Sequence, residues 1–432
     1  MGLMTLIILL ALETVWLIWS ITTKDPHREE KSIVRIALLL LFSGLLLSGV
    51  YQWSFRYLAI LLVLVIQAII GAVVLIRKQD VRRTTGYFIR RYAGNSLLFI
   101  LALSLAIVFP QYDQPAVTGD YHIATARYTW TDDSRTDPFS DTQANRVLTV
   151  EFWYPDQTDE TFPLVVFSHG AFGFSGSNYT TFAQLVSHGY VVASIGHTGQ
   201  AFYTKDTSGQ VTIAEIDFIS RAAEINANQD PAQEEAIYQT TSEWMKLRTG
   251  DEHFVIDTIL ALCREQADDP LFSAINSEHI GLMGHSLGGA SSAQIGRERS
   301  DIDAVIVLDG TMLGEVTGYQ NGEPVLNKTP YPVPLFNIYA EDHYTDSLRI
   351  NGAEYSNFAA SRNAVSAYET VFRDAGHLNF TDLPLFSPLL ARLLGTGSVD
   401  ERACIDTMNQ VVLDFFDSCL KNDGVPHIAK DY

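Results

Sequence analysis

The chain has few cysteines and few basic residues. Only three of its 432 residues are cysteines (Cys263, Cys404 and Cys419), which excludes a disulfide-rich scaffold. Cys404 and Cys419 could pair in an oxidising compartment, whereas isolated buried thiols are the simpler interpretation. Lysine and arginine number 29 against 50 acidic residues, giving a net charge of -21. We therefore expect no nucleic-acid partner, because such binding needs a basic face.

The sequence also lacks internal repeats and long low-complexity tracts. Apolar residues make up 47% of the chain and charged residues 18%, a balance that excludes a disordered or fibrous protein. Its length is sufficient for two or three domains.

Charge and apolar character divide the chain into two parts. Residues 1–110 contain 11 basic and 5 acidic residues, whereas residues 111–432 contain 18 basic and 45 acidic residues. The first part is also far more apolar. We therefore predict an all-α transmembrane module with about four helices over residues 1–112, followed by an acidic, water-soluble domain over residues 113–432.

Four apolar stretches approach the roughly 20 residues that a bilayer requires. They are residues 3–21, 33–50, 57–76 and 92–109. Arg35 lies near the edge of the second stretch, where its side chain can snorkel. Glu13 lies near the middle of the first and is either a functional intramembrane acid or a residue bonded to a neighbouring helix. The first stretch lacks a basic leader and a cleavage pattern, so we expect a retained helix.

The connections between these stretches predict an orientation. The first and third connections are rich in basic residues, whereas the second carries only Arg56. The basic residues concerned are Lys24, Arg28, Lys31 and Arg35, then Arg77, Lys78, Arg82, Arg83, Arg90 and Arg91. With four crossings both basic connections face the cytoplasm, which predicts a multi-pass cell-membrane protein with residues 113–432 on the extracytoplasmic side. Three crossings would put the domain inside.

Strands and helices alternate in the second part. The predicted strands are residues 147–154, 164–168, 190–195, 280–283, 304–308, 335–339 and 369–372, and the predicted helices are residues 182–188, 253–264, 290–297, 357–368 and 405–420. This alternation is typical of an α/β fold with a mostly parallel sheet and helices on both faces. Residues 200–247 interrupt it with an acidic segment of one or two helices, which is either a cap over the active site or an exposed insertion.

A glycine-rich turn carries the clearest chemical signal. Gly284-His285-Ser286-Leu287-Gly288-Gly289 follows a short apolar strand and precedes a helix, the context of a nucleophile elbow. Ser286 is the predicted nucleophile, held in a tight turn that lifts its hydroxyl from the sheet. The N–H of Leu287 begins the helix and can bind an oxyanion.

A serine nucleophile needs a base, and an acid that orients the base. Of the three histidines after Ser286, namely His343, His377 and His427, only His377 directly follows the last predicted strand. Asp309 and Asp342 each follow a strand and are both candidate acids. The usual position after the later strand favours Asp342 from topology alone.

The loop after residues 164–168 provides the second oxyanion donor in this scheme. It reads Ser168-His169-Gly170-Ala171-Phe172-Gly173, and its glycines let the backbone approach a substrate closely. The N–H of Ala171 is the candidate donor, while His169 is expected to brace the loop.

Several ordered segments together resemble a known family. They are Tyr128-Thr129-Trp130-Thr131-Asp132-Asp133-Ser134-Arg135, Trp153-Tyr154-Pro155, residues 162–170, residues 187–193, the elbow, Leu308-Asp309-Gly310 and His377-Leu378-Asn379-Phe380-Thr381-Asp382. Residues 117–422 resemble the α/β-hydrolase family of the plasma and intracellular type II platelet-activating factor acetylhydrolases and their bacterial relatives. The resemblance implies an α/β-hydrolase fold, no metal or cofactor, Asp309 as the acid and Ala171 as an oxyanion donor. It also implies esters of short or oxidised acyl chains, notably on phospholipids.

These observations predict a membrane-tethered serine carboxylic-ester hydrolase that acts on a small-molecule or lipid ester. The predicted triad is Ser286, His377 and Asp309, with Asp342 as the alternative acid. An acyltransferase or peptidase would use the same triad with another acceptor or leaving group. A membrane sensor whose hydrolase-like domain only binds a ligand is the remaining alternative.

Overall fold

The computed structural model describes residues 1–77, 83–156, 160–227, 233–266 and 269–432. The chain forms two compact units. One comprises Met1–Asp113 with Pro384–Leu393, and the other comprises Gln114–Leu383 with Leu394–Tyr432. Lys78 and Arg82, which contribute to the predicted orientation, lie outside the described residues.

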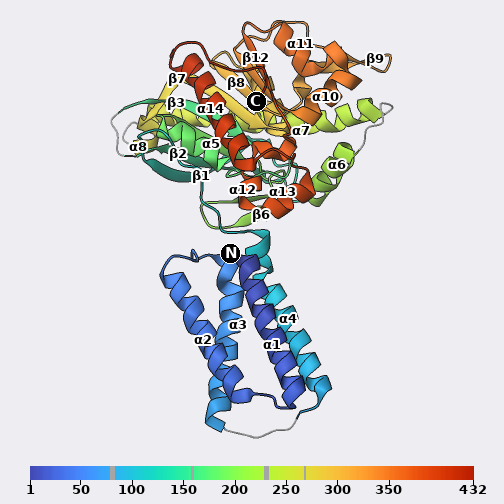
Figure 1. The fold of residues 1–432 in the computed structure, drawn as a ribbon. Coiled ribbons are helices and arrows are strands. Elements are labelled where there is room, and N and C mark those ends of the chain that lie inside the picture. Colours follow the sequence, from blue (N-terminus) through green and yellow to red (C-terminus); the bar gives the residue numbers. More distant parts are fainter. Residues whose placement is uncertain (78–82, 157–159, 228–232, 267–268) are drawn as a thin grey trace. The chain divides into compact units, whose positions relative to one another are not determined.

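The first unit is helical, as the long apolar stretches predict. Over residues 1–113 its elements are α1 (Gly2–Thr23), α2 (Arg28–Leu47), the short 3₁₀ helix η1 (Phe55–Tyr57), α3 (Leu58–Arg77) and α4 (Thr85–Val108). The four α-helices form a bundle (Figure 1), in which α1 packs mainly on α4 and α2 mainly on α3. Many large apolar side chains, such as Leu47, Leu62 and Ile76, point out of the bundle.

Three helical segments are long and apolar enough to cross a membrane: Gly2–Thr23, Phe55–Arg77 and Thr85–Val108. The second predicted stretch, residues 33–50, is not among them. It forms the latter part of α2, which ends at Leu47, and the first two turns of that helix are highly charged. The apolar part from Ile33 to Leu47 spans only about 22 Å at a rise of about 1.5 Å per residue, less than the hydrocarbon thickness of about 30 Å.

Glu13 is bonded to a neighbouring helix. Its Oε1 accepts a hydrogen bond from Asn95 Nδ2 of α4 over 3.0 Å. This bond agrees with the interpretation that Glu13 is a residue bonded to a neighbouring helix. It satisfies part of the hydrogen-bonding capacity of the acid inside the bundle.

The second unit is built on an eight-stranded sheet with the strand order β1-β2-β4-β3-β7-β8-β11-β12. These strands are β1 (Ile123–Thr136), β2 (Asn145–Pro155), β3 (Phe162–Ser168), β4 (Val191–Gly196), β7 (Ile275–His285), β8 (Ala304–Leu308), β11 (Leu335–Ala340) and β12 (Ala367–Phe372). The six strands from β4 to β12 are parallel, and β2 is antiparallel to both of its neighbours. This mostly parallel sheet confirms the predicted fold class.

Helices cover both faces of the sheet. Alternate residues of β3, Leu164 and Val166, pack with Ile256 and Ile259 of α7 on one face. Val165 and Phe167 pack on the opposite face with Phe182 of α5 and with α14. The elements here are α5 (Tyr179–Ser187), α7 (Glu234–Glu265), α8 (Pro270–Ser273), α9 (Leu287–Glu298) and α14 (Glu401–Leu420). Burial on both faces explains why the inner strands read as continuous apolar runs.

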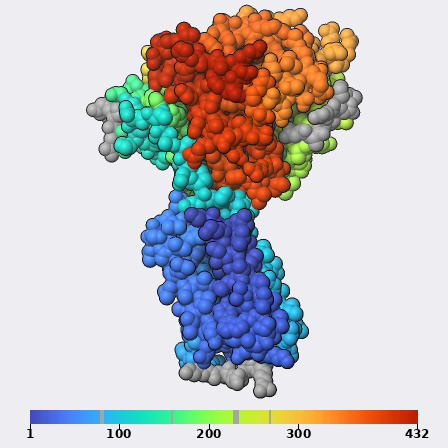
Figure 2. All heavy atoms as spheres, in the orientation of Figure 1, coloured from blue at the N-terminus to red at the C-terminus, as the bar shows by residue number. Residues whose placement is uncertain are grey.

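The remaining elements lie in the connections between strands or between β12 and α14. They are β5 (Tyr203–Lys205), β6 (Val211–Ile213), α6 (Ile216–Ala227), η3 (Leu313–Glu315), β9 (Val316–Gln320), β10 (Glu323–Leu326), α10 (Glu341–Ile350), η4 (Gly352–Glu354), α11 (Ser356–Arg362), η5 (His377–Phe380), α12 (Leu383–Phe386) and α13 (Pro388–Leu394). In the space-filling view, residues after about 300, coloured orange to red, make up most of the visible face of the second unit (Figure 2).

Two predicted elements differ from the structure. The helix predicted over residues 357–368 ends at Arg362, because Ala367 and Tyr368 pair with β11 at the start of β12. The segment 200–247 contains the hairpin β5–β6 as well as α6, and its last helix is not separate. That helix is the first half of α7, which continues to Glu265 and packs on the sheet.

All three cysteines are free. Cys404 and Cys419 lie on the same helix, α14, and 15 residues of helix separate them by about 22 Å. A disulfide requires Cα atoms within about 7 Å, so the pairing considered for these two residues is wrong.

Candidate active site

Ser286 lies in a strained turn between β7 and α9. Its backbone has φ 54° and ψ -123°, a region that residues with side chains rarely adopt and that is often found at functional sites. A Cβ atom at Gly284 would overlap the backbone of Gly288, and a Cβ atom at Gly288 would overlap that of Ser168. The two glycines are therefore required for the turn, as the predicted nucleophile elbow demands. No hydrogen bond of the Ser286 hydroxyl is found among the described residues.

Asp309 and His377 form a close pair. Asp309 directly follows β8 and is buried, and its Oδ2 lies 2.6 Å from Nδ1 of His377. The other carboxylate oxygen accepts a hydrogen bond from the N–H of Ala340 over 2.7 Å. Burial alone would raise the pKa of Asp309, but the adjacent rings of His343 and His377 outweigh burial and hold this pKa well below its usual range. The carboxylate is thus ionised and can orient an imidazole base.

His343 is a second imidazole on the same carboxylate. Its Nδ1 lies 3.0 Å from Oδ1 of Asp309, and its Nε2 lies 3.0 Å from the hydroxyl of Tyr355. In the sequence His343 is one of three histidines after Ser286, and it precedes the last predicted strand. Its place in the first turn of α10, directly after β11, is the signal that could have identified it, because such positions lie at the carboxyl edge of the sheet.

The alternative acid, Asp342, does not reach the pair. It lies in the first turn of α10, is exposed, and its Oδ1 accepts the N–H of His343 over 2.8 Å. The structure therefore brings His377 together with Asp309 and leaves Asp342 outside this cluster. His427 lies far along the chain on the exposed C-terminal segment, where its ring faces Asp414.

His285, next to Ser286, supports the backbone of His377. The two rings lie 4.6 Å apart between centroids, and Nε2 of His285 lies 3.0 Å from the carbonyl of His377. Burial lowers the pKa of His285 to about 3. The ring is therefore neutral at physiological pH, and its N–H donates to that carbonyl.

The two candidate oxyanion donors lie in segments that pack together. Leu287 begins α9, and Ala171 follows β3 in the loop that starts at His169. Leu287 and Ala171 belong to one apolar cluster with Phe218 of α6 and Met245 of α7. Residues of the 200–247 segment thus cover the oxyanion side of the elbow, which favours the cap over an exposed insertion.

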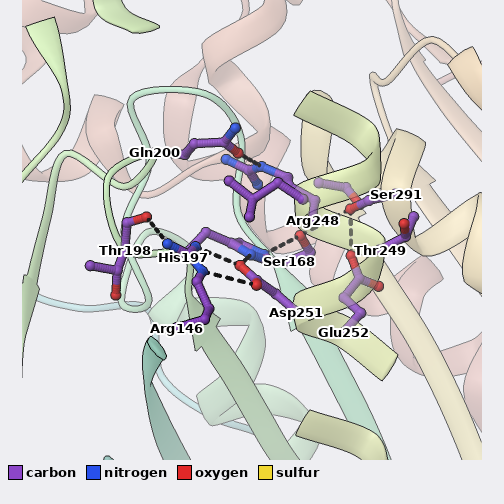
Figure 3. A network of polar contacts seen from close by, with 12 residues as sticks. Arg146, Ser168, His197, Thr198, Gln200, Arg248, Thr249, Asp251, Glu252 and Ser291 are labelled. Atoms are coloured by element: carbon purple, nitrogen blue, oxygen red, sulfur yellow. Dashed lines mark hydrogen bonds and ion pairs between the residues drawn. The ribbon is translucent and has the colours of Figure 1, made fainter. Parts of the chain in front are cut away.

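A buried polar network lies at the end of β3, where the loop that contains Ala171 begins (Figure 3). Ser168 Oγ at the end of β3 lies 2.9 Å from Nε2 of His197, and Nδ1 of His197 lies 3.0 Å from Asp251 of α7. Arg146 of β2 makes two hydrogen bonds to the same carboxylate. This Ser–His–Asp set is fully buried, so no substrate can reach Ser168. The set instead anchors the end of the strand from which the oxyanion loop starts.

Two more charged residues of α7 complete the network. Arg248 donates to the carbonyl of His169 and, over 2.8 Å, to Gln200. Glu252 accepts from Ser291, a residue of α9, the helix that follows Ser286. One helix thus holds both segments that carry the candidate oxyanion donors.

Sequence reasoning missed these α7 residues. The available signal was their spacing, since Arg248 and Glu252 continue the buried helical stripe that runs on through Val255, Ile256 and Ile259. A charge that falls on a buried stripe is expected to be paired or hydrogen-bonded. His169, predicted to brace the loop, is fully buried, and its Nδ1 lies 2.7 Å from the carbonyl of Gly170.

Among the described residues, no group of three or more His, Cys, Asp or Glu side chains is arranged to hold a metal ion. The chemistry that the cluster can support is proton transfer through His377, whose Nδ1 is paired with Asp309.

Comparison with known proteins identifies related sequences. The sequence model of the family described as platelet-activating factor acetylhydrolase, isoform II, matches residues 148–425. Proteins named platelet-activating factor acetylhydrolase match from Bos taurus (25% identity over 270 residues), Cavia porcellus (23% over 276) and Canis lupus familiaris (26% over 274). These matches cover 60%, 62% and 60% of this chain and 57%, 60% and 58% of the relatives.

A solved structure is also similar in fold. A ferulic acid esterase from Streptomyces cinnamoneus superposes with a TM-score of 0.52 at 21% identity, covering 72% of this chain and 94% of the esterase. At this identity the likeness concerns the fold, which is that of an α/β-hydrolase.

Proposed function

Because the chain belongs to the platelet-activating factor acetylhydrolase isoform II family, we propose that it is a membrane-tethered serine carboxylic-ester hydrolase. The single observation that carries this proposal is the pairing of His377 with the buried, ionised Asp309 at the edge of the sheet where the strained Ser286 turn also lies. The name of the relatives, platelet-activating factor acetylhydrolase, supports an ester with a short acyl chain such as acetyl as the proposed substrate.

In the first half-reaction His377 acts as the base. It takes the proton of Ser286 while the serine oxygen bonds to the acyl carbon, and the ester carbonyl becomes an oxyanion. The N–H groups of Leu287 and Ala171 stabilise that charge. The carbon–oxygen bond to the alcohol then breaks, and His377 gives its proton to the leaving alcohol.

In the second half-reaction water takes the place of the serine. His377 removes a proton from water, which attacks the acyl-enzyme through a second oxyanion, and Ser286 leaves with the proton returned from His377. The products are the carboxylic acid and the free enzyme. Throughout, Asp309 stabilises the imidazolium that forms transiently on His377.

A panel of esters tests this function. We expect the purified full-length chain in detergent to hydrolyse p-nitrophenyl acetate, p-nitrophenyl butyrate and a phospholipid with a short sn-2 acyl chain. Ser286→Ala should reduce turnover of all three to the background rate. The exposed Ser300→Ala serves as a matched control and should retain wild-type rates.

The panel also separates the alternatives. Stoichiometric release of free acid from the esters fits a hydrolase, whereas an acyl group found on an added alcohol in place of free acid would fit a transferase. Undiminished turnover in Ser286→Ala, or no turnover by the wild-type chain, would contradict the proposal.

The proposed tether is the bundle of the first unit. Three of its helical segments have the length and composition to cross a bilayer, and we propose that α2 crosses as well, with the Lys31 and Arg35 side chains reaching the headgroup region. With four crossings, the basic connections lie in the cytoplasm and the catalytic unit outside it.

A further inference from the structure

The second histidine on Asp309 is not used by the mechanism above. His343 Nδ1 lies 3.0 Å from Oδ1 of Asp309, while His377 Nδ1 lies 2.6 Å from Oδ2. The carboxylate is buried, whereas about a quarter of the His343 side chain is exposed. One buried carboxylate therefore serves two imidazoles, each through a different oxygen.

The protonation of these atoms follows from their partners. An ionised carboxylate only accepts hydrogen bonds, so Nδ1 of His343 carries the proton and donates it to Oδ1. In the neutral ring, Nε2 must then accept, and the hydroxyl of Tyr355, 3.0 Å away, is the donor. Thr311 Oγ1 lies 3.0 Å from the same hydroxyl and can donate to it in turn.

We propose that His343 is a positioning residue for this triad: its Nδ1–H fixes Oδ1 of Asp309, turns Oδ2 toward His377, and takes up part of the carboxylate charge. The inference rests on the proposed function, because it assigns Asp309 and His377 their catalytic roles. Oδ1 also accepts the N–H of Ala340, so loss of His343 leaves the carboxylate held by one donor fewer rather than unsupported.

The charges around His343 come from several elements. Asp342 and Asp346 lie on its own helix, Asp309 follows β8, and Tyr339 of β11 and Tyr355 before α11 face the ring. Burial acts to lower the pKa of His343, but Asp309 and the two aspartates of α10 outweigh burial and raise it. On acidification His343 therefore gains a positive charge beside Asp309, which opposes a second positive charge on His377.

This arrangement predicts how the pH profile depends on His343. In free enzyme the acid limb of kcat/KM reports protonation of the base. Without the His343 donor, the full charge of Asp309 acts on His377 and favours its protonation. The acid limb should therefore move to higher pH by about half a unit to one unit. The looser carboxylate should also lower kcat about tenfold.

The experiment compares substitutions that remove the donor with one that keeps it. His343→Ala and His343→Leu have no donor, whereas the side-chain N–H of His343→Asn can reach the position of Nδ1–H. The rates of p-nitrophenyl acetate hydrolysis are measured from pH 4.5 to 9 on the full-length chain, together with its melting temperature. His253→Asn, at an exposed histidine paired with Glu298, is the matched control and should leave the profile unchanged.

We expect the shifted acid limb and the lower kcat in His343→Ala and His343→Leu. In His343→Asn both should return to near wild-type values. An unshifted limb with kcat within twofold of wild type in whichever of the Ala and Leu variants folds would overturn the proposal. So would an Asn variant as impaired as these two at an unchanged melting temperature. If the wild-type chain itself shows no Ser286-dependent turnover, the proposed function fails, and this outcome is distinct from wild-type activity that is insensitive to His343.

Discussion

Asp309 concentrates several constraints in one residue. Its side chain accepts hydrogen bonds from His377, from His343 and from the N–H of Ala340, and its own backbone has a positive φ of 47°. Strain at a position with this many partners is retained when the surroundings hold the residue in place. The surroundings of Asp309 therefore hold both its side chain and its strained backbone in place.

Asp309→Asn should lower kcat about 10⁴-fold, because the amide cannot stabilise the imidazolium and favours the wrong tautomer of His377. Asp342→Asn should cost at most about tenfold, since its side chain is exposed and, among the described residues, accepts a hydrogen bond from the backbone N–H of His343 rather than from His377. The two variants are compared by steady-state ester hydrolysis, with folding checked by thermal melting. A larger loss at position 342 than at 309 would reverse the assignment.

Residues differ in how far the sequence determines their role. Ser286 was identifiable because its glycines and the preceding strand are local features. Local features do not decide between Asp309 and Asp342, because both residues follow parallel strands. Only tertiary contacts distinguish them. General topology favoured Asp342, and the family resemblance was needed to prefer Asp309. His343 was missed because its role depends on the meeting of α10 with the end of β8.

The loop after β3 approaches the nucleophile closely. A Cβ atom at Gly170 would lie 2.8 Å from Nδ1 of His285 and 3.2 Å from Cβ of Ser286. The loop would have to move away from the elbow to accept a side chain, and with it the N–H of Ala171. The position of this loop thus determines whether the N–H groups of Ala171 and Leu287 can both face one oxyanion.

Gly170→Ala should therefore lower kcat about 10²- to 10³-fold, the usual effect of losing one oxyanion donor. The melting temperature should fall by only a few degrees, because the loop is short. Gly318→Ala in β9 is the matched control, since its Cβ would meet no atom within 4 Å. Equal activity of the two variants would show that this loop contributes no donor.

Helix α7 provides a test of the buried network by pH. Burial raises the pKa of Glu252 to about 7. The folded chain thus holds a proton that the unfolded chain releases above about pH 4.5, so the wild type loses stability as pH rises from about 4.5 to 7. Glu252→Gln has no such proton.

The free energy of unfolding of Glu252→Gln relative to wild type should therefore rise between pH 5 and pH 7.5, by up to about 1.4 kcal/mol per pH unit. Melting temperatures of the two proteins, measured over this pH range, follow the difference. The exposed Glu243→Gln on the same helix is the control and should show no such trend. A difference for Glu252→Gln that is constant or falls with pH would contradict burial of a proton at this site.

The helices and strands that were predicted correctly are those with a clear local sequence pattern. The inner strands were recognised because burial on both faces produces continuous apolar runs. The helix predicted over 357–368 was too long because the sequence change at β12 is weak, and pairing with β11 decides where the strand begins. Helix α7 was divided at 247 because its charged residues resembled an exposed segment, although several are buried.

The whole molecule combines a mostly apolar bundle with an acidic catalytic unit. The chain spans about three fifths of the length of the relatives it matches, and helices α1 to α4 precede the matched residues 148–425. The two modules were separable in the sequence because charge and apolar content change together near residue 110. The number of crossings was less secure, because α2 mixes charged and apolar turns.

Topology can be tested on intact cells. Four crossings predict that a protease added outside cleaves the catalytic unit, and that a cysteine introduced at Arg83 is labelled by a membrane-impermeant reagent only after lysis. A cysteine at Ser48, in the connection between α2 and α3, should be labelled without lysis. Protection of the catalytic unit in intact cells would show that the predicted orientation is wrong.

Covalent trapping of Ser286 is the sharpest test of the proposed mechanism, in which this serine is acylated at the start of each turnover. The full-length chain is treated with a fluorophosphonate, digested, and analysed by mass spectrometry. We expect one adduct, on the peptide that contains Ser286, with much slower labelling in His377→Ala and none in Ser286→Ala. An adduct on another residue, or no adduct on a chain that still hydrolyses esters, would contradict it.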